Sequence, residues 1–135
     1  MPLKTKEVTT AVKKQRPKNL NLFTIRFPIP AIASILHRIS GLVVFLFIPF
    51  ILWGLYSSLA SQQSFDHLHE IFTTPWIKFV VWCVLSAFLY HFVAGIRHLL
   101  MDIGIGEELK SGKLSAIVTI LIAAVLIILT GVWLW

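Results

Sequence analysis

Charged side chains are scarce in this sequence of 135 residues, at 13% of the total against 57% for hydrophobic residues. An average soluble domain carries about 25% charged residues, so this composition excludes an ordinary soluble enzyme. A single cysteine, Cys83, excludes both a disulfide framework and a cysteine-based metal site within one chain. The chain therefore has the composition of an integral membrane protein, with room for three spans and little else.

Acidic residues are fewer still, six against twelve lysines and arginines. The resulting net charge of +6 could suggest a nucleic-acid partner. However, seven of the twelve basic residues lie before residue 31, and no aromatic residues are interleaved with them in the pattern that nucleic-acid binding favours. We therefore expect no nucleic-acid partner and a basic segment that lies at a membrane surface.

Three long apolar runs predict an all-α integral membrane fold with transmembrane helices over 31–56, 76–101 and 114–135. The connector 57–75 contains no lysine or arginine, whereas the segment 1–30 and the loop 102–113 do. Because positive residues stay on the cytoplasmic side, we expect 1–30 and 102–113 to be cytoplasmic and 57–75 to be periplasmic. The N-terminus is then inside and the C-terminus outside.

A first polar group interrupts the first apolar run. Ser34, His37, Arg38 and Gly41 follow the spacing of one helical face. Arg38 would lie roughly 12 Å into the span at 1.5 Å per residue. Charge at that depth costs about 3 kcal/mol on insertion scales, so it should face a protein interior, a water-filled cavity or a ligand. Two interpretations remain open for Ser34 and Arg38: an anionic or carbonyl ligand, or an ion pair with a partner subunit.

A second polar group, residues 91–102, ends the second run. His91 would lie about 15 Å below the cytoplasmic surface, where a neutral imidazole needs a hydrogen bond or a metal such as haem iron. Both a packed histidine and a ligand fit this position. His98 lies on the same face but about 10.5 Å further along the helix, so the two cannot ligate one iron from opposite sides. Snorkelling toward the cytoplasm is sufficient to explain Arg97.

The chemistry available to the chain is narrow. The sequence has no glycine-rich phosphate loop, no nucleophile with a paired base and no carboxylate pair inside the membrane. It can bind a cofactor and pass electrons, or it can anchor other proteins.

Four segments together resemble the larger cytochrome b membrane-anchor subunits of bacterial succinate dehydrogenases. The resemblance extends over most of the chain from Gln15 to Met101, and the third span fits in length and hydropathy without a motif of its own. The segments that carry it are 15–20, 24–29, 34–41 and 91–102.

The resemblance implies one part of a heteromeric helical bundle in the bacterial inner membrane. With a second small membrane subunit it would anchor a flavoprotein and an iron-sulfur subunit, and electrons would pass from succinate to ubiquinone. His91 would be an axial ligand of a haem b shared with the second subunit, and its iron the bound metal. His37 and Arg38 would lie near the haem propionates, and Ser34 with Arg38 in the quinone pocket. The chain alone would hold no complete catalytic site.

Two alternatives stay open at this point. A quinol:fumarate reductase anchor has the same architecture and runs the reaction in reverse. A purely structural anchor would bind no haem, and a visible spectrum of the membrane subunit would distinguish it from the others.

The charge distribution generates a test of topology. Reporter fusions after Gln63 and after Trp135 should both report an external position. The connector lacks positive residues, and three spans separate the cytoplasmic N-terminus from the C-terminus. An internal signal from either fusion would overturn the orientation.

Overall fold

The computed structural model describes residues 26–135, and these form four helices. They are α1 (Ile29–Ala60), α2 (Gln62–Thr73), α3 (Pro75–Asp102) and α4 (Leu109–Leu134). Most of the basic segment 1–30, with the motif 15–20 and the start of the motif 24–29, lies outside the described residues.

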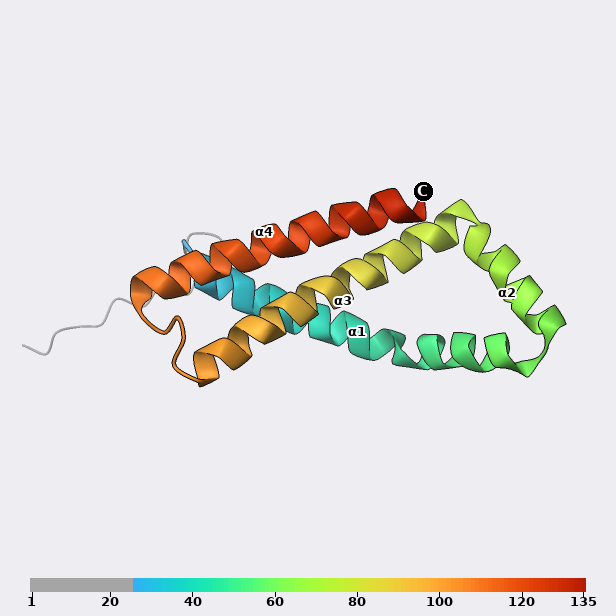
Figure 1. Ribbon diagram of the computed structural model, residues 1–135, viewed down its shortest axis with the longest axis horizontal. Coiled ribbons are helices and arrows are strands. Elements are labelled where there is room, and N and C mark those ends of the chain that lie inside the picture. Colours follow the sequence, from blue (N-terminus) through green and yellow to red (C-terminus); the bar gives the residue numbers. More distant parts are fainter. Residues whose placement is uncertain (1–25) are drawn as a thin grey trace, which may run out of the picture.

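Helices α1, α3 and α4 pack against one another, with α1 and α3 crossing at an angle, and the short α2 connects the C-terminal end of α1 to the start of α3 (Figure 1). Each of the three long helices is long and apolar enough to cross a membrane. Their lengths of 26 to 32 residues exceed the roughly 20 residues that a bilayer requires. The prediction of an all-α membrane protein with three spans is confirmed. We call the two ends of the bundle the α2 end and the loop end, the latter holding the α3–α4 loop.

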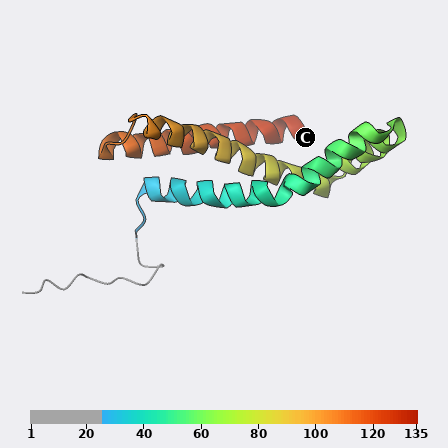
Figure 2. The ribbon, with the colours of Figure 1, turned by 90° about the horizontal axis from the view of Figure 1, so that it is seen from below.

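Prolines set the starts of two of these helices. Pro30 lies in the first turn of α1, and Pro75 opens α3. A proline is tolerated there because the first backbone N–H groups of a helix have no partner within it. Pro49 lies inside α1, which changes direction in its second half (Figure 2). An internal proline removes a backbone hydrogen bond and so favours such a bend.

The connector 57–75 contains a helix that the sequence analysis did not assign. Ser61 caps the start of α2: its hydroxyl accepts a hydrogen bond of 3.1 Å from the backbone N–H of Ser64. Leu68 of α2 is buried against the bundle, while Asp66 and Glu70 are exposed. The connector is therefore an amphipathic helix that covers the space between α1 and α3.

The loop after α3 is shorter than the expected 102–113, because α4 already begins at Leu109. Gly104 and Gly106 have φ angles of +83° and +88°, a conformation that glycine adopts at little cost and that ends a helix. Glu108 is extended and immediately precedes α4. Residues 109–113 thus belong to the first turns of α4.

Small residues allow α4 to approach α3 closely. Tyr90 and Ala94 of α3 form a buried cluster with Ala123 of α4. At the α2 end, the indole N–H of Trp82 donates to the carbonyl of Ile127 at 3.0 Å. Small side chains permit such close packing, which drives helix association where lipid is as apolar as the helices. The buried residues of α4 are Gly112, Ala116, Thr119 and Ala123.

Arg97 is buried, which corrects the expectation that it snorkels toward the cytoplasm. Its residue exposure is 7%, because the side chain is directed at α4. Its Nε donates to the Ser115 hydroxyl at 3.0 Å, and Nη2 donates to the carbonyl of Gly112 at 3.3 Å. The guanidinium therefore joins the last third of α3 to the first turns of α4.

These two hydrogen bonds predict the effect of removing the guanidinium. Arg97→Ala should lower the free energy of unfolding by about 2 kcal/mol, since hydrogen bonds to charged groups are worth that order. The thermal unfolding midpoint of the purified protein in detergent would measure it. Lys110→Ala is the matched control, because it removes an exposed cation from the first turn of α4, close in sequence to the Gly112 carbonyl that Arg97 contacts. Equal midpoints for the two variants would contradict this role of Arg97.

Candidate functional site

The candidate site lies where α1 and α3 meet, in the half of the bundle nearer the loop end. Nδ1 of His91 on α3 is 3.1 Å from the carbonyl oxygen of His37 on α1. A carbonyl oxygen can only accept a hydrogen bond, so Nδ1 must carry the hydrogen. In the neutral ring, Nε2 then holds a free lone pair and is the nitrogen available to a metal.

Two further residues of α1 surround the ring of His91. The buried Ser40 hydroxyl donates to the same His37 carbonyl at 2.8 Å and lies 3.4 Å from His91 Nδ1. Gly41 faces the ring so closely that a Cβ there would be 2.8 Å from His91 Cε1 and 3.1 Å from Nδ1. The residues 37–41 thus form a cradle for the His91 side chain.

The rings of three histidines lie in a row across this contact. The His37 ring is nearly parallel to that of His91, with centroids 4.3 Å apart and planes 14° apart. On its other side the His98 ring is 4.8 Å away and tilted by 39°. The sequence spacing placed His91 and His98 on one face of α3, but it did not show that His37 contacts both.

His37 carries an unmet hydrogen-bonding requirement. Its Nε2 is buried and has no hydrogen-bond partner within residues 26–135. This Nε2 lies 3.8 Å from the position that a Cβ on Gly95 of α3 would occupy, which is an ordinary van der Waals contact. A buried polar atom without a partner is rare and costly, so this nitrogen is an unusual feature of the contact between α1 and α3.

The remaining predicted site residues lie beside this row. Ser34 is half-buried, and Arg38 is exposed on the surface of α1. Next to Ser34, the carbonyl of Ala33 accepts a hydrogen bond of 3.0 Å from the buried Tyr90 hydroxyl, which ties the start of α1 to α3. The predicted face is therefore divided, with His37 and Gly41 against α3 and Arg38 outside the contact.

The residues fit one axial haem ligand. Within residues 26–135 there is no group of three or more histidines, cysteines or carboxylates arranged to hold a metal ion. His91 instead offers a single nitrogen whose opposite ring nitrogen is fixed by a backbone carbonyl, the arrangement typical of metal-binding histidines. A haem that takes one ligand from this chain is compatible with both observations.

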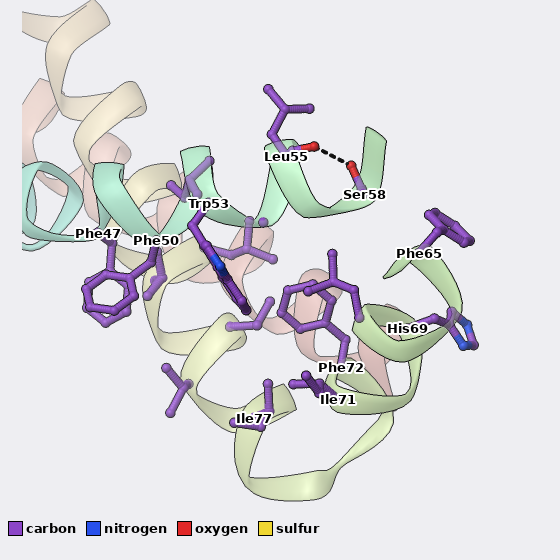
Figure 3. A pocket seen from close by; sticks show the side chains of 17 residues that line it. Phe47, Phe50, Trp53, Leu55, Ser58, Phe65, His69, Ile71, Phe72 and Ile77 are labelled. Carbon is purple, nitrogen blue, oxygen red and sulfur yellow. Dashed lines mark hydrogen bonds between the residues drawn. The ribbon is translucent and has the colours of Figure 1, made fainter. Parts of the chain in front are cut away.

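A cavity of about 710 Å³ lies at the α2 end, between α1, α2 and α3 (Figure 3). Its lining is almost wholly apolar and includes Trp53 of α1 and Phe72 of α2. Ser34, His37, Arg38 and His91 are not among the lining residues. Sequence reasoning missed this cavity, although the spacing of Phe65, Leu68 and Phe72 was the signal for an apolar helix face that could cover it.

Comparison with known proteins agrees with this architecture. Residues 12–130 match the model of the succinate dehydrogenase/fumarate reductase transmembrane subunit family. The chain is 47% identical over 122 residues to the succinate dehydrogenase cytochrome b556 subunit of Coxiella burnetii, covering 90% of this chain and 98% of the relative. The corresponding subunit of Paracoccus denitrificans is 33% identical over 116 residues, covering 85% and 88%.

A further relative has the same description. The cytochrome b556 subunit of Rickettsia felis is 30% identical over 104 residues, which cover 77% of this chain and 81% of the relative. The matches cover most of both chains, and they agree with the three spans and with the polar groups on α1 and α3. The chain therefore belongs to the succinate dehydrogenase/fumarate reductase transmembrane subunit family, as a cytochrome b membrane subunit of succinate dehydrogenase.

Proposed function

We propose that this chain is a haem b-binding anchor subunit in a bacterial inner membrane that passes electrons from succinate to ubiquinone. The observation that carries the proposal is the hydrogen bond from His91 Nδ1 to the His37 carbonyl, which leaves Nε2 free to ligate iron. The relatives are named as cytochrome b556 subunits, which supports haem b as the group bound.

His91 would hold the haem iron together with a residue of a second small membrane subunit. When bound, the haem supplies a one-electron carrier inside the membrane. His98 does not provide the second ligand from this chain, because the His37 ring lies against it and against His91. We assign His37 and Arg38 to the neighbourhood of the haem propionates, because the His37 ring stacks on that of His91 and Arg38 follows it in α1 as an exposed cation.

The quinone site is proposed at Ser34 and Arg38. A quinone has an apolar ring and two carbonyl oxygens that gain negative charge on reduction, so its pocket needs apolar walls and a few donors. Ser34 offers a hydroxyl, and Arg38 offers a fixed positive charge one turn further along α1. An exposed arginine in a membrane span must be covered by a partner subunit or a ligand, which a shared quinone pocket provides.

The apolar cavity at the α2 end is less suitable for quinone reduction. It lies about 15 Å along α1 from His37, counted to Phe47 at 1.5 Å per residue, and its apolar walls offer few groups to stabilise charge on the quinone oxygens. The site at Ser34 is nearer the loop end, where we place the iron-sulfur and flavoprotein subunits on the cytoplasmic face.

Neither alternative is favoured. The three relatives are named as succinate dehydrogenase subunits, which supports succinate oxidation over quinol:fumarate reduction. A haem-free structural anchor gives no reason for a half-buried histidine with a free Nε2 beside a second buried, unpartnered imidazole nitrogen.

The ligand assignment predicts a spectral change. His91→Leu, in the assembled complex, should change or abolish the low-spin spectrum, since leucine cannot ligate iron. Visible and EPR spectra of purified complex would measure this. His98→Leu is the control, and it should keep the low-spin spectrum with at most a shifted reduction potential. An unchanged spectrum in His91→Leu would show that the ligand lies elsewhere.

The quinone site predicts a second, separate loss. Ser34→Ala and Arg38→Leu should each slow ubiquinone reduction by about tenfold or more, equivalent to about 1.4 kcal/mol of barrier. Steady-state reduction of a soluble quinone analogue with succinate as donor would measure it.

Electron transfer from succinate to an artificial acceptor that bypasses the membrane subunits should be largely spared in both variants. Equal loss of the two activities would indicate failed assembly. Normal quinone reduction in both variants would contradict the quinone role of Ser34 and Arg38.

A further inference from the structure

We infer that Gly41 of α1 is a positioning residue for His91: its missing side chain sets the orientation of the proposed haem ligand on α3. The inference rests on the proposed haem-binding function. Gly41 has no side chain, and it would itself touch neither the iron nor the quinone.

The contact at Gly41 is closer than any side chain would allow. A Cβ there would lie 2.8 Å from Cε1, 3.1 Å from Nδ1 and 3.8 Å from Nε2 of His91. Carbon atoms in contact are normally about 3.5 to 4.0 Å apart, so even a methyl group would displace the ring. The ring edge that carries all three of these atoms faces the backbone of α1.

The ring has little freedom to move without losing its other contacts. Its Nδ1 is held at 3.1 Å by the His37 carbonyl, and one of its faces is covered by the His37 ring at 4.3 Å. A methyl group at Gly41 would push the ring away from α1. The Nδ1 hydrogen bond would then lengthen, and the direction of Nε2 would change.

Both changes affect a haem ligand in ways that can be measured. A hydrogen bond from the opposite ring nitrogen makes an imidazole a stronger donor to iron, and it fixes the ring plane. Losing it should raise the haem reduction potential, because the oxidised iron loses electron donation. A rotated ring plane should change the g values of the low-spin ferric haem.

The chain offers a matched control on the same helix. At Gly54 a Cβ would meet no atom within 4 Å, so Gly54→Ala adds the same methyl group to α1 without displacing anything. Both substitutions replace a helical glycine by alanine, which favours the helix by a similar amount. A difference between the two variants therefore reports the contact with His91.

The test compares Gly41→Ala with Gly54→Ala in the full complex. We expect Gly41→Ala to raise the haem potential, to shift the low-spin EPR signal and to weaken haem retention by about tenfold or more, as typical for residues that orient a metal ligand. Gly54→Ala should match the native complex in all three measurements. If Gly41→Ala had the same haem potential, EPR signal and haem content as the native complex, the inference about Gly41 would be overturned, and His91 would remain the proposed ligand.

A double variant covers the case in which Gly41→Ala assembles poorly. If the methyl group acts through the His91 ring, Gly41→Ala should have no additional effect on complex yield in membranes when His91 is already alanine. If Gly41→Ala lowered the yield equally in the native background and in the His91→Ala background, Gly41 would act on something other than the His91 ring. His91→Leu with an unchanged low-spin spectrum would overturn the proposed function itself, and is distinguishable from both outcomes.

Discussion

The hydrogen bond from His91 Nδ1 to the backbone carbonyl of His37 is the interaction on which the arrangement of the candidate site depends. It decides which nitrogen of the half-buried His91 imidazole is free, and it joins α1 to α3, the two helices that carry the predicted site residues. A backbone carbonyl is well suited to this purpose, because it has no hydrogen of its own and no side-chain rotamer to change. The free Nε2 follows from this one contact.

The surrounding packing keeps that contact in register. Tyr90, the residue before His91, donates to the Ala33 carbonyl, so α3 is attached to α1 at two points about one helical turn apart on α1. On its other side α3 is held by α4, through the small residues of α4 and the hydrogen bonds of Arg97 and Trp82. Helix α3 is thus fixed between two neighbours, which limits the movement of His91.

The spans and both polar groups could be predicted from the sequence, because hydropathy and helical spacing are local properties. His91 and His37 stand out as imidazoles inside apolar runs, and the motif resemblance assigned roles to both. Helix α2 was not predicted, because a connector of mixed polarity gives a weak signal even though Phe65, Leu68 and Phe72 are spaced for one apolar face.

Contacts between helices could not be predicted from spacing alone. Arg97 lies near the end of α3, where snorkelling is the ordinary expectation, and only the position of α4 shows that it is buried. The position of the His37 ring, against both His91 and His98, likewise depends on how α1 lies against α3. The close contact between Gly41 and His91 could not be predicted either, because a glycine can occur within a helix for several different reasons.

An experimental map of the assembled complex with its haem would show directly whether His91, held by the His37 carbonyl, gives the iron its ligand from this chain. At side-chain resolution we expect iron bonded to Nε2 of His91, Nδ1 still within hydrogen-bond distance of the His37 carbonyl, and the opposite ligand from another chain. Iron bonded to His37 or His98, or to no residue of this chain, would contradict this expectation.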